Sequence, residues 1–248
     1  MRSIDRSAHT NRWRRLPTAE KALFALGMMA AALVASHWLV LLAVFSLTLV
    51  VTLLGARIAW RDVRNAARVP LGFIALSTLA QLVTLHFGGG WPQLGLATSE
   101  AALHGLFIGL RSTTCVAALL FLALTTPLSS ILDLLRRAGL SRDLSDIALL
   151  MLRMVWLLLD CLDAGWRSQV NRLGHCGWKR SIRSSGSLAV ALLPRVLSRA
   201  QRLNDGLASR GFTGDLRFLS IEGQTSWQRL SLTGMAPLVL MAAALGVS

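Results

Sequence analysis

The hydrophobic positions of this chain gather into long runs. Five apolar runs can be read along the sequence, at residues 22–35, 38–55, 70–87, 101–124 and 231–247. Most of them approach the ~20 residues that an α-helix needs to cross a bilayer. Ser36 and His37 separate the first two runs, so we expect a short helical hairpin there. The pattern predicts an all-α integral membrane protein with about five transmembrane helices.

Residues 125–230 follow a different pattern, in which apolar residues recur at helical spacing among many charges. Pro127 suits the first position of a helix, and we expect a short amphipathic helix from there to about Ala138. A second, longer helix is expected from about residue 141 to the glycines at 174 and 177. These segments predict long amphipathic helices outside the bilayer core.

The third helix of this section is expected to begin between Gly186 and Pro194 and to end at Arg210. Gly211 follows in the place where helices commonly finish with a left-handed residue. A cation such as Arg210 is favourable in the last turn, because the helix dipole is negative there. A basic stripe runs along the helix at spacings of four and three residues, formed by Arg195, Arg199 and Arg202.

Composition and charge agree with a membrane location. The 248 residues are 54% hydrophobic and 15% charged, with a mean hydropathy of +0.55, which is too apolar for a soluble globular protein. Lys and Arg number 26 against 12 Asp and Glu, a net charge of +14. Four arginines lie between the second and third runs, whereas residues 87–100 contain no Lys or Arg. By the positive-inside rule the N-terminus is cytoplasmic and residues 87–100 lie outside.

These observations divide the chain into four predicted parts. Residues 1–21 form a basic cytoplasmic N-terminus, residues 22–124 the N-terminal transmembrane helices, residues 125–230 a cytoplasmic region of amphipathic helices, and residues 231–248 a C-terminal transmembrane helix. The protein is expected to be multi-pass.

Arg111 and His104 lie inside the fourth apolar run. An arginine at the bilayer centre costs roughly 2.5–3.5 kcal/mol on insertion scales, so Arg111 should face protein or water. It could belong to a substrate path, or it could pair with carbonyl or polar groups of a neighbouring helix. We favour the pairing.

Other functions are weaker alternatives. A metal transporter or sensor in its own right would use His37, His86, His104, His175 and Cys176, which are not clustered at ligand spacing. An intramembrane enzyme would need paired acids at membrane depth, but the acids of the middle section lie among arginines and suit salt bridges. One of them, Asp163, precedes Arg167 by four residues, the favourable order for an ion pair on a helix. Basic helices would also contact membrane lipid, and we expect no nucleic-acid partner.

One stretch resembles a known family. Residues 207–217, Leu-Ala-Ser-Arg-Gly-Phe-Thr-Gly-Asp-Leu-Arg, resemble the second Ala-Arg-Gly coupling motif of the transmembrane coupling (T) subunits of energy-coupling factor transporters, in particular the cobalt and nickel branch. Residues 125–127 and 136–140 resemble the entry to the coupling region of that family. The resemblance covers residues 111–220, about half of the chain, and is weaker over the N-terminal spans.

The resemblance implies a role for two helix tips that each bind one ATPase subunit. The second tip would be Ala208, Ser209, Arg210 and Gly211, with Ser209 in place of the usual alanine. The first tip would contain Arg172 and Gly174, although an extra leucine separates them, and Arg167 is the rival. The basic stripe of Arg195, Arg199 and Arg202, with Arg167, would support the coupling helices.

The resemblance also implies the partners and the location of the complex. These are two ATPase subunits, a membrane subunit that binds cobalt or nickel, and the cytoplasmic (inner) membrane of a bacterium. The chain itself has no G-x-x-x-x-G-K-[ST] sequence. It is therefore expected to be a non-catalytic subunit that binds no cofactor or metal, with ATP and Mg²⁺ held by its partners.

Overall fold

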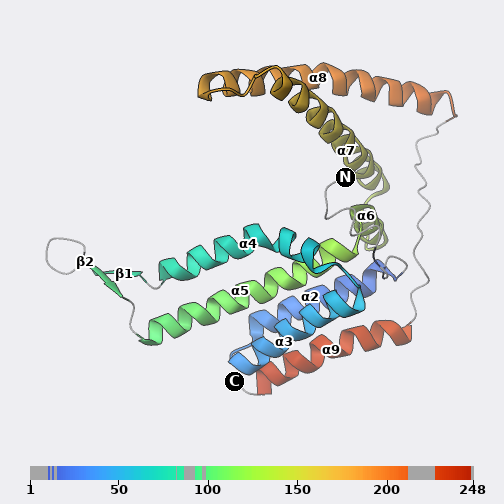
Figure 1. The fold of residues 1–248 in the computed structure, drawn as a ribbon. Helices are drawn as coiled ribbons and strands as arrows, with labels where there is room; N and C mark the ends of the chain where they lie inside the picture. Colours follow the sequence, from blue (N-terminus) through green and yellow to red (C-terminus); the bar gives the residue numbers. More distant parts are fainter. Residues whose placement is uncertain are drawn as a thin grey trace. The chain divides into compact units, whose positions relative to one another are not determined.

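The computed structural model describes residues 11, 13, 16–81, 83–86, 93–96, 99–211 and 227–246, which are helical apart from one short β-hairpin (Figure 1). The helical class predicted from the apolar runs is therefore confirmed. The chain divides into two compact units, of which the first contains residues 1–131 and 220–248 and the second residues 132–219.

The first unit begins with two helices joined by a tight connection. α2 covers Thr18–Val34, and α3 covers Trp38–Val50 and continues into one π-helical turn, η2, at Val51–Gly55. The backbone is extended at His37, with φ −109° and ψ 143°, which ends one helix direction before the next begins. The two helices lie side by side (Figure 1). The first two apolar runs are therefore separate helices, as the sequence predicted.

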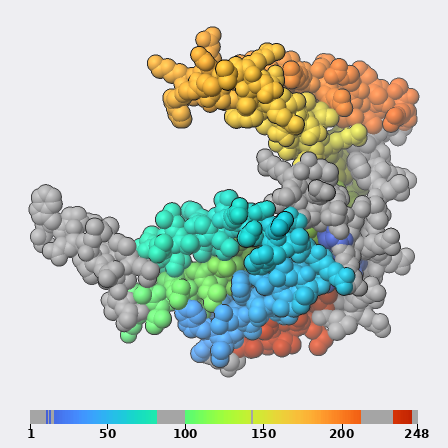
Figure 2. Space-filling view, viewed as in Figure 1, coloured from blue at the N-terminus to red at the C-terminus, as the bar shows by residue number. Residues whose placement is uncertain are grey.

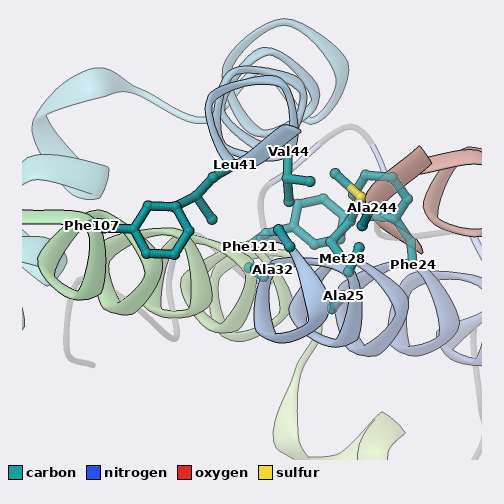
Figure 3. Packing of buried hydrophobic residues seen from close by; sticks show 12 residues of the cluster. Phe24, Ala25, Met28, Ala32, Leu41, Val44, Phe107, Phe121 and Ala244 are labelled. Atoms are coloured by element: carbon teal, nitrogen blue, oxygen red, sulfur yellow. The ribbon is translucent and has the colours of Figure 1, made fainter. Parts of the chain in front are cut away.

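Two further helices complete the core of this unit. α5 covers Ser99–Thr125 and α9 covers Trp227–Gly246, and both pack against α2 and α3. Phe121 on α5 is nearly inaccessible, and its ring meets the ring of Phe24 edge-on at 5.3 Å between centroids. Figure 3 shows the buried cluster around these rings, which includes Ala25, Met28, Ala32, Leu41, Val44, Phe107 and Ala244.

Glycines allow α2 and α9 to approach closely. A Cβ atom on Gly27 would lie 2.7 Å from Cβ of Pro237, and one on Gly234 would lie 2.9 Å from Cδ2 of Leu23. Both distances are too short for two carbon atoms. At Gly27 the obstacle is the rigid ring of Pro237, whereas at Gly234 the end of the Leu23 side chain would have to move to make room. Helices in a lipid environment gain little from hydrophobic burial against each other, and close packing through small residues takes its place.

The third predicted span had the wrong boundaries. α4 covers Trp60–Gln81, whereas the expected span was residues 70–87, and Pro70 lies inside the helix. A proline in a helix interior removes a hydrogen bond and normally costs about 3 kcal/mol. The second half of α4 packs along α5, where a Cβ on Gly109 would lie 2.5 Å from Oγ1 of Thr78. This close packing helps to offset the cost and holds the helix together beyond the proline.

A β-hairpin replaces the end of that predicted span. β1 at Val83–His86 pairs antiparallel with β2 at Gln93–Leu96, with Val83 opposite Leu96. β-branched residues such as Val83 and Thr84 favour an extended chain, which explains why α4 stops before them. The glycines at 88–90 lie outside the described residues.

The second unit is built from two long helices. The short helix α6 at Leu128–Arg137 begins in the first unit and ends in the second. α7 covers Arg142–Asn171 and α8 covers Trp178–Ala208, and together they form a helical hairpin. Near the turn, the side chain of Leu188 on α8 occupies the space left by Gly165 on α7.

The predicted start of the third amphipathic helix was wrong. α8 begins at Trp178, before the expected interval at residues 186–194, and Pro194 lies inside it. Within the expected interval lie Leu188 and Leu192, whose side chains are buried. Their packing favours a continuous helix, so neither the glycine at 186 nor the proline ends it.

Length and composition mark two segments of the described chain as able to cross a membrane. They are Trp38–Gly55 and Glu100–Thr125, and Thr233–Ala244 is a shorter apolar stretch. The expectation of about five crossings stays a prediction.

Candidate functional site at the two ends of helix α8

The turn between α7 and α8 contains the first predicted tip. Arg172 occupies the C-cap position of α7 with an exposed side chain. Leu173 then adopts a left-handed conformation with φ +58°. Its amide donates to the carbonyl of Val170 at 3.0 Å, and the amide of Gly174 donates to the carbonyl of Gln169 at 2.8 Å. This pair of bonds closes many helices, usually with glycine where Leu173 stands.

Leu173, and not Gly174, adopts the left-handed conformation, so backbone conformation does not explain the glycine at 174. The explanation is lack of space for a side chain. A Cβ atom on Gly174 would lie 3.0 Å from the carbonyl oxygen of Gln169 and 3.0 Å from Oγ of Ser184. Ser184 Oγ donates to the carbonyl of Gly174 at 2.8 Å, and Gln169 Nε2 donates to the carbonyl of Ser184 at 2.8 Å. The turn is thereby tied to the first turns of α8, so the backbone around Arg172 is held in one conformation.

Sequence reasoning missed the side chains that support this turn. Gln169 and Ser184 are ordinary polar residues on amphipathic helices, and only the pairing of α7 with α8 brings them together. Trp166 and His175 are a second such pair, stacked with their ring centroids 4.0 Å apart. His175 Nδ1 also lies 3.2 Å from Oγ of Ser181. Nothing in the spacing of these residues signalled the contacts.

Arg167, the rival for the first tip, lies on the last turns of α7 before the turn. Its Nε donates to the backbone carbonyl of Asp163 at 3.3 Å. The predicted ion pair with the carboxylate of Asp163 is absent from the described residues, so that prediction was wrong. A surface ion pair contributes little against the side-chain entropy of holding two charged groups together, which leaves the exposed carboxylate hydrated. An ion pair that does form in this unit joins Arg136 and Asp146, 3.9 Å apart.

The second predicted tip is the end of α8. The helix ends at Ala208. At Arg210 and Gly211 the hydrogen bonds span three residues instead of four: the amide of Arg210 donates to the carbonyl of Leu207 at 3.1 Å, and the amide of Gly211 donates to the carbonyl of Ala208 at 3.1 Å. Gly211 has φ +70°, so the predicted left-handed residue is confirmed. Ser209 donates its hydroxyl back into the helix, to the carbonyl of Gly206. Residues 212–217 of the motif lie outside the described residues.

One continuous helix therefore separates the two tips. α8 has 31 residues, which at 1.5 Å per residue gives it a length of about 46 Å, and Arg172 lies in the turn before it and Arg210 just after it. Both guanidinium groups are exposed, and within the part of the chain that the structure describes neither forms an ion pair. α8 is exposed over much of its length, and part of it is in view in Figure 2.

Two of the three arginines in the basic stripe on α8 lie at a pocket, and the third does not. Arg199 and Arg202 line a pocket together with Arg153 of α7, whereas Arg195 does not line it. The sequence did not predict that Arg153 would meet these arginines, because the register between α7 and α8 cannot be read from either helix alone.

Arg111 pairs with a neighbouring helix, as favoured from the sequence. Its Nη2 donates to the carbonyl of Ala35 at 2.6 Å, and its guanidinium carbon lies 4.9 Å from the ring centroid of Phe107. Ala35 follows the last residue of α2, where carbonyl groups lack helical donors and carry the negative end of the dipole. No described contact joins His104 to Arg111, and the side chain of His104 is exposed.

A metal site is not formed by the described side chains. Among them, no three His, Cys, Asp or Glu residues gather closely enough to hold an ion. The side chain of His86, one of the histidines considered above, lies outside the described set.

Comparison with known proteins finds a matching family and relatives that are described as cobalt transport proteins. Residues 10–220 match the family of CbiQ cobalt transport proteins. The cobalt transport protein CbiQ of Rhodobacter capsulatus is 37% identical over 218 residues, which are 88% of this chain and 87% of that protein. CbiQ of Salmonella typhimurium is 30% identical over 232 residues, 87% of this chain and 99% of that protein. A protein of Methanocorpusculum labreanum named as a fused cobalt transport protein, CbiMQ, is 24% identical over 202 residues, 77% of this chain and 33% of that protein.

These relatives are transport proteins and not enzymes, which agrees with the predicted non-catalytic transport component. The matched residues include both helix tips and the helices that position them. The resemblance first noted around residues 207–217 is thus confirmed at the level of the family: the chain belongs to the CbiQ family of cobalt transport proteins.

Proposed function

We propose that this chain is the transmembrane coupling subunit of an energy-coupling factor importer, for cobalt or else for nickel. In this proposal two ATPase subunits bind the chain, one at Arg172 and one at Arg210. ATP and Mg²⁺ are held by those ATPases, and a separate membrane subunit binds the metal ion that is transported.

The observation that carries the proposal is the placement of two exposed arginines at opposite ends of one helix. Arg172 precedes α8 and Arg210 follows it, each at a backbone turn closed by a left-handed residue. Arginine binds a carboxylate through two parallel hydrogen bonds, which gives a docking contact a defined direction. An exposed ion pair alone contributes little, so each tip is expected to be enclosed by a groove of its ATPase.

The length of α8 suggests how motion is transmitted. Two ATPases that close on ATP change the distance or angle between their grooves. A 31-residue helix held at both ends converts that change into a tilt or shift of the whole helix. α7, which is joined to α8 through the turn at Arg172, would move with it, and the motion would pass along the chain through α6.

A relative supports the proposed membrane partner. In the protein named CbiMQ, a segment like this chain is fused to a further cobalt transport component. Fusion of two proteins is a common sign that the separate proteins work together. We propose that the present chain likewise works with such a component. In this proposal it is a multi-pass subunit of the bacterial cytoplasmic membrane, with about five crossings and a cytoplasmic N-terminus, and it contacts membrane lipid.

The test is the double variant Arg172→Ala with Arg210→Ala, produced together with its ATPases and its metal-binding subunit. Arg183→Ala is the matched control, because Arg183 is an exposed arginine of the same helix that belongs to neither tip. We expect the double variant to lose copurification of the ATPases and uptake of radiolabelled cobalt, and the control to retain both. Full assembly and transport by the double variant would overturn the proposal.

The single variants give a second readout. If each tip serves one ATPase, Arg172→Ala and Arg210→Ala should each weaken ATPase binding, and their effects should be separable. Arg167→Ala distinguishes the rival assignment, since it should then have a smaller effect than Arg172→Ala. Competition of cobalt uptake by nickel measures which ion the assembled complex prefers.

A further inference from the structure

A pocket between α7 and α8 is lined by three arginines from two helices. Arg153 comes from α7, and Arg199 and Arg202 come from α8. The pocket has a volume of about 220 Å³, and its remaining lining residues are Met154, Leu157 and Leu203. It therefore combines three cationic side chains with three apolar ones.

Among the described residues, no carboxylate neutralises the three guanidinium groups. Within the part of the chain that the structure describes, none of them has a carboxylate within ion-pair distance or a side-chain hydrogen bond. Asp205 follows Arg202 by three residues on α8, a spacing that permits a pair, and yet no pair forms. Three like charges around one pocket repel each other, and an anion placed among them would remove that repulsion.

The volume and the apolar lining residues restrict which anions would fit the pocket. The volume is below the ~300–1,000 Å³ of pockets that enclose drug-sized ligands, so a compact charged group fits better than a whole nucleotide. Arginine binds phosphate oxygens through paired hydrogen bonds. A small inorganic anion would make no use of Met154, Leu157 and Leu203, whereas the phosphate of a lipid has apolar chain attached to it.

The exposed surface of α7 is also suited to lipid. On this helix, large apolar side chains at spacings of three and four residues form an exposed stripe, namely Leu144, Ile147, Met151 and Val155. Leu197 on α8 is likewise exposed. A helix with an apolar face and arginines beside it is typical of helices that lie at the membrane surface.

We propose that the pocket formed by Arg153, Arg199 and Arg202 is a binding site for the phosphate group of an anionic phospholipid, with the start of the lipid's apolar chains against Met154, Leu157 and Leu203. The site would hold the α7–α8 hairpin at the inner membrane surface. It is independent of the two tips, which contain none of these six residues.

The experiment uses the full-length protein purified in an uncharged detergent. Native mass spectrometry measures the binding of added phosphatidylglycerol, with phosphatidylcholine as the zwitterionic comparison and inorganic phosphate as the lipid-free anion. The test variant is R153Q/R199Q/R202Q. The matched control is R180Q/R183Q/R195Q, which removes the same charge from arginines of α8 that do not line the pocket.

We expect the natural protein to bind one phosphatidylglycerol in preference to phosphatidylcholine. The affinity of the test variant for phosphatidylglycerol should fall on the order of 100-fold, because it lacks three cations that each attract an anionic lipid. The control should keep most of the binding. The single variant Arg153→Gln should show a smaller loss in the same direction and serves if the triple variant does not fold. A triple replacement by lysine keeps the charge but not the paired hydrogen bonds, and should bind at an intermediate level.

Several results would overturn the proposal. Equal losses in the test and control variants would mean general attraction to a basic surface. Binding of inorganic phosphate with no preference for the lipid would mean a site for a free anion. If the test variant bound lipid normally and instead lost its ATPases, the pocket would be a docking site for an acidic protein segment.

Discussion

The two units of this protein bury their apolar residues to very different extents. In the first unit Met28, Leu41 and Val44 are completely inaccessible, and four helices surround them. In the second unit, among the described residues, the buried hydrophobic side chains are Leu149, Leu188 and Leu192. Large apolar side chains elsewhere on α7 and α8 are exposed, such as Trp178 at 81% and Val190 at 75%.

The difference in burial indicates a different role for each unit. The first unit has a packed interior and close helix contacts through glycine, so its shape is determined by its own residues. The second unit is an extended hairpin with turns closed by defined hydrogen bonds and with long surfaces left open. Such a surface is suited to contact with other molecules, which agrees with the proposed docking of ATPases and lipid.

The largest expected effect comes from removing a central ring of the first unit. Phe121→Ala removes a side chain that is 1% exposed and contacts the rings of Phe24 and Trp13. We expect a loss of about 3–5 kcal/mol of stability, typical of a buried phenylalanine replaced by alanine. Thermal unfolding of the purified protein in detergent measures it.

Phe73→Ala is the control for that variant, because Phe73 on α4 is 73% exposed. Its effect on unfolding should be small. Similar losses for Phe121→Ala and Phe73→Ala would contradict the packed interior assigned to the first unit.

A smaller effect is expected from filling the close contact between α2 and α9. Gly27→Leu forces a side chain against Pro237, whose Cβ already lies 2.7 Å from the position of the first added atom. Overpacking of this kind costs about 1–3 kcal/mol. Gly186→Leu on α8 is the comparison, since nothing lies within 4 Å of its Cβ position. An equal loss of thermal stability in both variants would remove the distinction between a closed and an open unit.

The smallest effect should be local to the turn before α8. Ser184→Ala removes the hydroxyl that donates to the carbonyl of Gly174 at 2.8 Å, a bond worth about 0.5–1.5 kcal/mol. We expect faster hydrogen exchange at residues 172–177 with little change in overall unfolding. In the control Ser198→Ala, the lost hydroxyl bonds only to the carbonyl of Arg195, three residues earlier on α8. If exchange in the turn were unchanged by Ser184→Ala, the turn would be held by its backbone alone.

Much of this fold follows from local sequence. The helix predicted at residues 101–124 is α5 at Ser99–Thr125, and Gly211, three residues after the end of α8, has the predicted left-handed conformation. Both depend on neighbours in sequence, an apolar run in the first case and a glycine after a helix in the second. The pairing of Arg111 with a carbonyl was also foreseen, because a buried charge must find a partner, although its identity was not.

The remaining features depend on contacts between distant residues. Pro70 and Pro194 indicate helix ends by their chemistry, and packing of α4 on α5 and of α8 on α7 keeps both helices continuous. The left-handed Leu173 could not be read from a pattern that expects glycine. The meeting of Arg153 with Arg199 and Arg202 depends on the register of two helices, which no single helix encodes.

The bond between Arg111 and Ala35 also places a condition on how the protein is made. The two residues are 76 positions apart, so at about 5–20 residues per second α2 and its end carbonyl are synthesised on the order of 4–15 s before their donor. During that interval the carbonyl of Ala35, at the end of α2 in the α2–α3 hairpin, must be satisfied by water or by the insertion machinery. The hairpin can reach its final packing only after α5 and then α9, which also packs against it, have been synthesised, which makes the assembly of this unit a late event in translation.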